Sequence, residues 1–335
     1  MPIRVLLLVS MALYQAIASW LEDRHLSPGQ LVDIGNYRLH LYVAGEAYIT
    51  GDTSPTIVLD HNLGGVEGYF LIEELAKLAR VCIYDRAGYG WSDRSPYPRT
   101  SRQIVKELDT LLTQAGINPP YILVGNSFGS YNVRLYTYLF PQKVAGIVLI
   151  DGLHETGMLK MPIQLKALKL LFLSGFLMSI LGAMLGIIRL LKVCGVFELL
   201  KPGLRCFSKN SLNSVKRSFC RTKHWMTMIR EMVNLDTSAR QVSVANHLGA
   251  VPIVRIKASS SFKPNFWTPF IPLQGANQLR DKMHVKLCNL SQNWLQFEAS
   301  KSDHFVWIDQ PDVVVNAVRT ILDKINSSHY GLDRE

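Results

Sequence analysis

The segment YILVGNSFGSYNVRLYTYLFP, residues Tyr121 to Pro141, decides the fold of this chain. An apolar strand leads into the pentapeptide GNSFG around Ser127, and a helical pattern follows directly. A serine between two glycines at such a corner has a mechanical explanation. The nucleophile projects from a tight turn, and the glycines relieve clashes with the neighbouring backbone. An ordinary Ser-Gly turn is the alternative interpretation.

Strand and helix patterns alternate on both sides of this corner. The Gly35-Asn36 pair divides residues 31–45 into a hairpin. We expect further strands at 56–60, 81–84, 121–124, 145–150, 252–258 and 295–299, and helices at 66–79, 100–115, 276–290 and from 311 onward. A basic, apolar and mostly helical region at 155–248 interrupts the alternation. The order predicts an α/β architecture.

The charge of the chain is concentrated in one region. The 335 residues carry a formal charge of +10, and 12 lysines and arginines against one acid lie between Met158 and Lys223. That block has no aromatic or glycine-rich signature of nucleic-acid binding and surrounds a very apolar run. We therefore expect a membrane surface as a partner, and no nucleic acid.

Two apolar segments are long enough to concern a membrane. Between Arg4 and Glu22 lie 17 uncharged residues, VLLLVSMALYQAIASWL, which we interpret as an N-terminal membrane anchor. A cleaved signal peptide with AIAS as its processing site, or a buried helix, are the alternatives. The second segment, Leu170 to Ile188, has 19 residues without a charge.

The five cysteines show neither a CxxC pair nor zinc-ligand spacing, so we expect no metal site. The first of them lies in an apolar strand and is interpreted as a core residue. A disulfide among the three cysteines of the basic region stays open. The five are Cys82, Cys194, Cys206, Cys220 and Cys288.

From these motifs the chain resembles the α/β-hydrolase fold family, and more narrowly a group of membrane-linked serine hydrolases with the motifs DRAGYGWSD and PYILVGxSFG. They stand here at 85–93 and 120–129, and the resemblance covers 31–151 and 251–325. It implies a mostly parallel sheet flanked by helices, with a helical cap inserted after the sixth strand. The expected parts are an anchor or signal segment (1–24), the first part of the core (25–154), the cap (155–248) and the second part of the core (249–335).

The resemblance also implies a Ser-Asp-His triad in that chain order. Ser127 is the expected nucleophile, and His304 lies in the loop after the last strand, where the family places its catalytic base. Asp151 ends the strand after the nucleophile, 24 residues beyond Ser127, and is the expected acid. Asp281 is the reserve, whereas Asp303 adjoins the histidine and would have difficulty reaching its ring edge.

The oxyanion hole should pair the backbone N–H of Phe128 with that of Leu63. Asn62 stands where relatives often have glycine. Asp85 and Arg86 are interpreted as a turn that supports the fold. Gly125, Asn126 and Gly129 support the elbow, although the family usually has histidine where Asn126 stands.

A single membrane crossing by residues 170–188 would put Ser127 and His304 on opposite sides of the bilayer. The segment must re-enter, be matched by a second crossing, or lie against the membrane or the core. On a membrane surface, its basic flanks would sit among headgroups: Lys160, Lys166, Lys169, Arg189 and Lys192.

These observations predict a serine hydrolase that cleaves an apolar small-molecule ester or a lipid through an acyl-enzyme, without a metal or organic cofactor. We expect it to be membrane-associated through its N-terminal anchor, in the secretory pathway or at the cell membrane. A peptidase or amidase of the same fold is one alternative. A binding protein with reduced catalysis is the other, with Asn62 and Asn126 as its signs.

Overall fold

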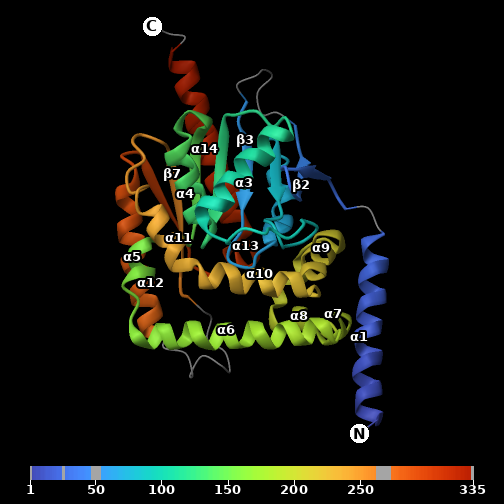
Figure 1. Cartoon of the computed structure of the whole chain (residues 1–335). Coiled ribbons are helices and arrows are strands. Elements are labelled where there is room, and N and C mark those ends of the chain that lie inside the picture. Colours follow the sequence, from blue (N-terminus) through green and yellow to red (C-terminus); the bar gives the residue numbers. More distant parts are fainter. Residues whose placement is uncertain (1, 25–26, 47–53, 262–272, 333–335) are drawn as a thin grey trace.

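The centre of the molecule is one eight-stranded sheet with the strand order β1-β2-β4-β3-β5-β6-β7-β8 (Figure 1). The computed structural model describes residues 2–24, 27–46, 54–261 and 273–332. The β1–β2 and β2–β4 pairs are antiparallel, and the pairs from β4 to β8 are parallel. The strands are β1 (Gln30–Asp33), β2 (Arg38–Ala44), β3 (Thr56–Asp60), β4 (Val81–Tyr84), β5 (Tyr121–Asn126), β6 (Val144–Ile150), β7 (Ile253–Ala258) and β8 (Trp294–Ala299).

Helices cover both faces of the sheet, and each face has its own apolar core. Alternate strand residues face opposite sides, so Leu123 lies in one core while Ile122 and Val124 lie in the other. The first core is closed by α3 (Ser101–Gln114), α4 (Gly129–Leu139) and α11 (Leu235–Val242). The second is closed by α2 (Ile72–Leu75), α13 (Val306–Asp309) and α14 (Pro311–Leu332). This arrangement confirms the predicted α/β class and its mostly parallel sheet flanked by helices, whereas the helical cap stays a prediction.

One predicted helix is shorter than expected. Instead of a helix over 66–79, the chain forms a 3-10 helix, η1 (Glu67–Phe70), and the single turn of α2. The reason lies at Gly68, whose N–H donates to His61 Nδ1 at 3.1 Å. A Cβ on Gly68 would lie 2.5 Å from His61 Cε1, so the backbone follows the buried imidazole at this point. The predicted strands at 56–60 and 81–84 are present with those bounds.

Seven α-helices lie between β6 and β7, and we call residues 155–242 the helical insertion. They are α5 (Glu155–Leu159), α6 (Ile163–Met184), α7 (Ile187–Val193), α8 (Val196–Leu200), α9 (Lys209–Phe219), α10 (Thr222–Val233) and α11. The 3-10 helix η3 (Pro202–Cys206) joins α8 to α9 within the insertion. Outside it lie η2 (Pro141–Lys143), η5 (Cys288–Leu290) and α12 (Leu273–Leu287), which precedes β8.

Helices α1 (Pro2–Asp23) and α6 are both long and apolar enough to span a membrane, and neither is buried. The most apolar 18-residue window of each is only 6% buried. The alternative of an ordinary buried helix therefore does not describe residues 170–188. In Figure 1, α6 runs crosswise to α1 along the outer side of the insertion.

The carboxyl end of α1 is fixed to the helical insertion by polar contacts. Gln15, 7% exposed, donates to the Cys220 carbonyl at 2.7 Å and accepts from Arg189 Nε at 2.8 Å. Glu22 accepts hydrogen bonds from Arg189 and, at 3.0 Å, from Arg221. Processing after AIAS would remove Gln15 and its two contacts. From the sequence, we expect Arg189 to sit among lipid headgroups. That expectation is wrong, because the side chain is held inside the protein and Arg189 is only 6% exposed.

We predict that Glu22→Gln lowers the free energy of unfolding by about 1–3 kcal/mol, because the guanidinium of Arg189 loses its carboxylate partner and that of Arg221 keeps only Asp23. Denaturant unfolding in detergent measures the change. The matched control is Glu74→Gln, which breaks an exposed pair with Lys77 at 2.6 Å and should change stability by less than about 1 kcal/mol. Equal losses in the two variants would contradict a structural role for the Glu22 contacts.

Candidate active site

Ser127 occupies a strained corner between β5 and α4. Its φ is +50°, a left-handed conformation that is rare for residues other than glycine. Its N–H donates to the Ile150 carbonyl at 2.9 Å, which ties the corner to the neighbouring strand. A Cβ on Gly125 would lie 2.7 Å from the Gly129 carbonyl, and one on Gly129 would lie 2.4 Å from that of Asp60. Only glycines allow this close approach of strand and helix.

Asp151 and His304 meet beside this corner. Asn126 pairs with Ile150 in the sheet, so Ser127 and Asp151 follow directly at the carboxyl ends of adjacent strands. His304 lies in the loop between β8 and α13, and its Nδ1 is 2.6 Å from Asp151 Oδ2. The imidazole is 26% exposed, whereas the carboxylate is buried. The Ser127 hydroxyl makes no hydrogen bond within the described part of the chain.

The other two carboxylates considered from the sequence point elsewhere. Asp281 is half-exposed and pairs with Lys257 at 3.1 Å. Asp303 pairs with Lys201 of the helical insertion, also at 3.1 Å. Of these three acids, Asp151 alone makes a hydrogen bond to His304.

The Asp151–His304 contact shifts the pKa values of both groups. Burial would raise the pKa of Asp151, but hydrogen bonds from His284 and His304 outweigh it and hold that pKa below its usual range. Burial would lower the pKa of His304, but the hydrogen bond and negative charge of Asp151 raise it above its usual value. The pair is therefore suited to stabilise an imidazolium.

The backbone N–H groups of Leu63 and Phe128 are the oxyanion donors expected from the sequence. Neither donates a hydrogen bond within residues that the structure describes. The loop before Leu63 is held by His61, which is fully buried and whose Nε2 lies 3.2 Å from the Tyr84 carbonyl. Burial lowers the pKa of His61 to about 3, so its imidazole is neutral and structural.

Arg86 also holds the loop that carries Leu63. Its guanidinium is fully buried and donates to the carbonyls of His61 and Asn62 at 2.8 and 2.6 Å. It also donates to Asp60 at 2.7 Å and, through two nitrogens, to Glu231 of α10 at 2.9 Å. One side chain thus joins the end of β3, the oxyanion-side loop and the helical insertion.

Three buried polar groups near the corner have unused hydrogen-bonding atoms. They are Asn62 Oδ1, Glu67 Oε2 and Asn126 Oδ1, which have no hydrogen-bond partner among the described residues. Burial raises the pKa of Glu67 above its usual value. The Glu67 carboxyl therefore favours its neutral form more than an exposed glutamate does.

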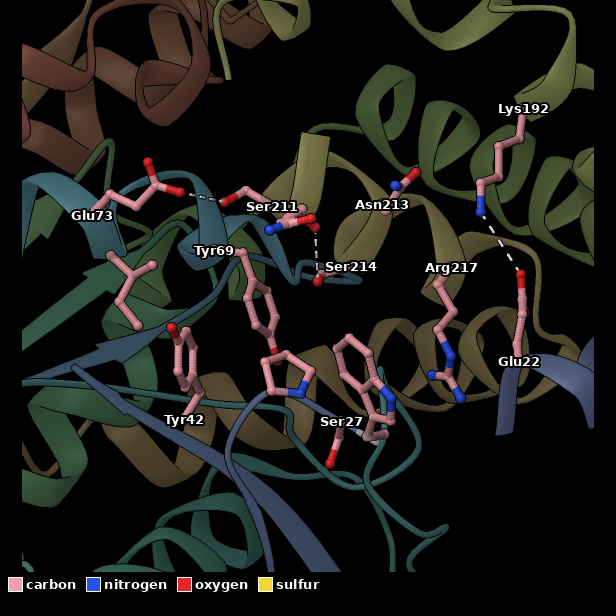
Figure 2. Close-up of a pocket in the computed structure, with 14 residues that line it drawn as sticks. Glu22, Ser27, Tyr42, Tyr69, Glu73, Lys192, Ser211, Asn213, Ser214 and Arg217 are labelled. Carbon is pink, nitrogen blue, oxygen red and sulfur yellow. Dashed lines mark hydrogen bonds and ion pairs between the residues drawn. The ribbon is translucent and has the colours of Figure 1, made fainter. Parts of the chain in front are cut away.

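Two cavities lie between the sheet and the helical insertion. The smaller, about 230 Å³, has almost entirely apolar walls between Glu67 and Phe305, the neighbour of His304. The larger, about 780 Å³, has both polar and apolar walls and lies beside the end of α1, between Glu22, Tyr69 and Arg217 (Figure 2). Ser127, Asp151 and His304 do not line it. These three residues do not line the smaller cavity either, but Phe305, the residue next to His304, does.

Two contributors to the site were missed from the sequence. His284 of α12 lies on the second oxygen of Asp151, with its Nε2 at 2.9 Å. Glu231 of α10 is the charge partner of Arg86. Both come from helices distant in sequence, and neither stands in a local motif. All five cysteines are free thiols, and the described residues contain no cluster of three or more His, Cys, Asp or Glu suited to a metal ion.

Known proteins share this architecture. The sequence model described as alpha/beta hydrolase fold matches residues 55–179. The chain is 32% identical over 149 residues to the probable transporter efuK of Hormonema carpetanum, covering 43% of this chain but only 21% of that protein. It is 23% identical over 277 residues to an AB hydrolase superfamily protein of Gibberella zeae, covering 74% of this chain and 79% of that one. A putative alpha/beta hydrolase from Nostoc sp. PCC 7120 superposes with a TM-score of 0.66 at 15% identity, covering 88% of this chain and 97% of the other.

We predict that Arg86→Met lowers the free energy of unfolding by about 3–5 kcal/mol, because it leaves Asp60 and Glu231 as buried charges without their partner. Urea unfolding measures the loss. The control is Arg38→Met, which removes an exposed pair with Asp93 and should cost less than about 1 kcal/mol. If Arg86→Met were no more damaging than Arg38→Met, Arg86 would not be holding these elements together.

Proposed function

Because the chain belongs to the α/β-hydrolase superfamily, we propose that it is a serine hydrolase that cleaves an apolar carboxylic ester or a lipid through an acyl-enzyme. The observation that carries this proposal is the strained Ser127 beside the Asp151–His304 pair. Nucleophilic acyl transfer requires a serine and an imidazole that is oriented by a carboxylate. Here Ser127 and Asp151 follow paired residues of β5 and β6, and the buried carboxylate of Asp151 orients His304.

In the proposed acylation step, His304 Nε2 takes the proton of the Ser127 hydroxyl as the oxygen attacks the ester carbonyl. The negative charge that develops on the carbonyl oxygen is held by the N–H groups of Leu63 and Phe128. Asp151 stabilises the imidazolium that forms. The imidazolium then gives its proton to the leaving alkoxide, and the acyl group remains on Ser127.

Deacylation repeats these steps with water as the nucleophile. His304 takes a proton from water, the hydroxide adds to the acyl carbonyl, and the same two amides hold the oxyanion. The Ser127 oxygen leaves and recovers its proton from His304, which releases a carboxylic acid. Neither step needs a group from outside the chain other than water.

We predict that Ser127→Ala abolishes labelling by a fluorophosphonate probe and ester hydrolysis, because the probe forms its bond with the activated serine oxygen. Gel fluorescence and hydrolysis of p-nitrophenyl esters measure the two activities. Ser243→Ala, which changes an exposed serine bonded to the Arg240 carbonyl, is the control and should label like the unchanged protein. Labelling that persists in Ser127→Ala would contradict the assignment of Ser127 as the nucleophile. If the unchanged protein is folded but is not labelled, a binding protein is favoured over an enzyme.

The apolar cavity beside Phe305 supports an apolar acyl group. Its walls come from the helical insertion and from the core, and include Phe197, Leu212 and Phe219. At about 230 Å³ it lies below the usual range for drug-sized ligand pockets, about 300–1,000 Å³. We therefore expect this pocket to hold a short or medium acyl chain.

We predict that Leu212→Trp, which fills this cavity, lowers kcat/KM for p-nitrophenyl octanoate by about tenfold or more and leaves the acetate ester nearly unchanged. The adjacent substitution Asn213→Trp is a matched control, because Asn213 lines the other, larger cavity. A thermal unfolding scan checks that both variants fold. Equal effects on both chain lengths, or the same loss in Asn213→Trp, would remove this cavity from the acyl site.

The two exposed apolar helices support a membrane-attached enzyme. The part of α1 that precedes the contacts of Gln15 would insert into the bilayer, and α6, crosswise to it in Figure 1, would lie in the plane of the interface. Large apolar side chains of α6 are highly exposed, with Leu170 at 67% and Met178 at 66%. A helix in that plane leaves both halves of the sheet on one side of the membrane, as the single sheet demands.

We predict that bimane attached to Met178→Cys is quenched by lipids that carry a shallow doxyl group. The same label at Tyr138→Cys, at the exposed end of α4, which lies away from α6 in Figure 1, should not be quenched. The exposed Cys194 and Cys206 are replaced by serine for this measurement. Equally low quenching at both positions would leave α1 as the only membrane element.

A further inference from the structure

The carboxylate of Asp151 is held from two sides by two histidines. His304 Nδ1 lies 2.6 Å from Oδ2, and His284 Nε2 lies 2.9 Å from Oδ1. The Ala258 N–H adds a longer contact to Oδ1 at 3.3 Å. The Ser-Asp-His mechanism uses only the His304 contact, so the second histidine needs its own explanation.

The contacts of His284 indicate which of its two ring nitrogens carries the proton. The side chain is buried, and its Nδ1 has no hydrogen-bond partner among the described residues. Its Nε2 faces a carboxylate oxygen, which can only accept. The proton therefore belongs on Nε2, and His284 donates to Asp151. The His284 carbonyl is in turn held by Arg255 at 2.6 Å, which fixes this turn of α12 against β7.

We propose that His284 is a positioning residue of the active site, whose Nε2–H holds the Asp151 carboxylate so that Oδ2 faces His304. The proposal rests on the proposed serine hydrolase function. Asp151 needs such support because it sits at a tight corner of its own, with a φ of +40°. A carboxylate held at one oxygen has less freedom to turn the other oxygen away from its imidazole.

The same hydrogen bond moderates the basicity of His304. The hydrogen bond from His284 stabilises the negative charge of Asp151. The electrostatic attraction between that charge and the proton on His304 is therefore weaker. Without the donor, Asp151 would attract the imidazolium proton more strongly and the pKa of His304 would rise. The other charged or titratable groups that act on this pair are Arg280 of α12, Asp303 beside His304 and Glu67 of η1, and none of them is changed by a substitution at His284.

Two substitutions separate this role from simple packing. His284→Leu removes the donor and keeps an apolar side chain of moderate size, whereas His284→Gln retains a terminal N–H near the position of Nε2. We expect His284→Leu to lower kcat for p-nitrophenyl esters by about 10- to 100-fold with KM little changed, the loss of one hydrogen bond to a charged group. In the pH profile of kcat/KM for this variant, the acid limb should move to higher pH. His284→Gln should recover most of the rate and return the limb toward that of the unchanged protein.

A folded His284→Leu variant with unchanged kcat and an unchanged acid limb would overturn the proposal, and so would a folded His284→Gln variant as impaired as His284→Leu. Thermal unfolding establishes whether each variant folds. Nitrogen NMR of the unchanged protein with ¹⁵N-labelled histidine gives an independent test that needs no variant. A proton on His284 Nε2 supports the role, whereas a proton on Nδ1 would overturn it.

These outcomes are distinct from failure of the proposed function. That failure appears as an unchanged protein that the fluorophosphonate does not label, or as a Ser127→Ala variant that still hydrolyses esters. If the fluorophosphonate labels Ser127 and substitutions at His284 change neither the labelling rate nor its pH profile, the triad stands and only the positioning role of His284 is rejected. Asp151→Asn provides the reference for complete loss of the acid, with kcat lower by about 10⁴-fold.

Discussion

The buried guanidinium of Arg86 is the contact on which the arrangement of the site depends. It joins Asp60 at the end of β3, two carbonyls of the loop that carries Leu63, and Glu231 of the helical insertion. A guanidinium presents five donors in a rigid fork, and no other side chain could join these acceptors at once. The corner of Ser127 packs on the same strand end, because Gly129 approaches the Asp60 carbonyl. The proposed oxyanion site and nucleophile therefore share one support.

Strain and charge are concentrated at neighbouring strand ends. Ser127 and Asp151 are the non-glycine residues with positive φ in the described chain, and they follow paired positions of β5 and β6. Left-handed backbone turns each side chain out of its strand direction and over the edge of the sheet. The cost of two such corners is offset by the sheet hydrogen bonds behind them, including the Ser127 N–H to the Ile150 carbonyl. A loop from β8 then needs only to bring His304 to the exposed side of Asp151.

The sequence predicted what depends on local pattern and missed what depends on long-range packing. Alternation was sufficient for most of the strands and for the α/β class. Ser127, Asp151 and His304 were placed by the resemblance that the GNSFG corner carries, and the structure brings Asp151 and His304 together. Nothing local marked His284 or Glu231, because each acts on a residue more than a hundred positions away. The short η1 was also missed, since the contact of Gly68 with His61 overrides a pattern that is otherwise helical. Periodicity reports which face of an element is buried, and it does not report which polar side chains meet inside the protein.

The basic block has a different role in the structure from the one its composition suggests. Several of its cations are paired with acids of the protein: Lys169 with Asp236, Arg189 with Glu22, Lys201 with Asp303, Lys216 with Glu198, and Arg217 with Asp23. Two of these acids belong to α1 and one to the loop of His304, so the pairs hold the helical insertion to α1 and to the core. Charges satisfied in this way offer little to anionic headgroups. Attachment of the insertion to a bilayer would then rest chiefly on the exposed apolar side chains of α6, with the charges serving to fix the insertion to α1 and to the core.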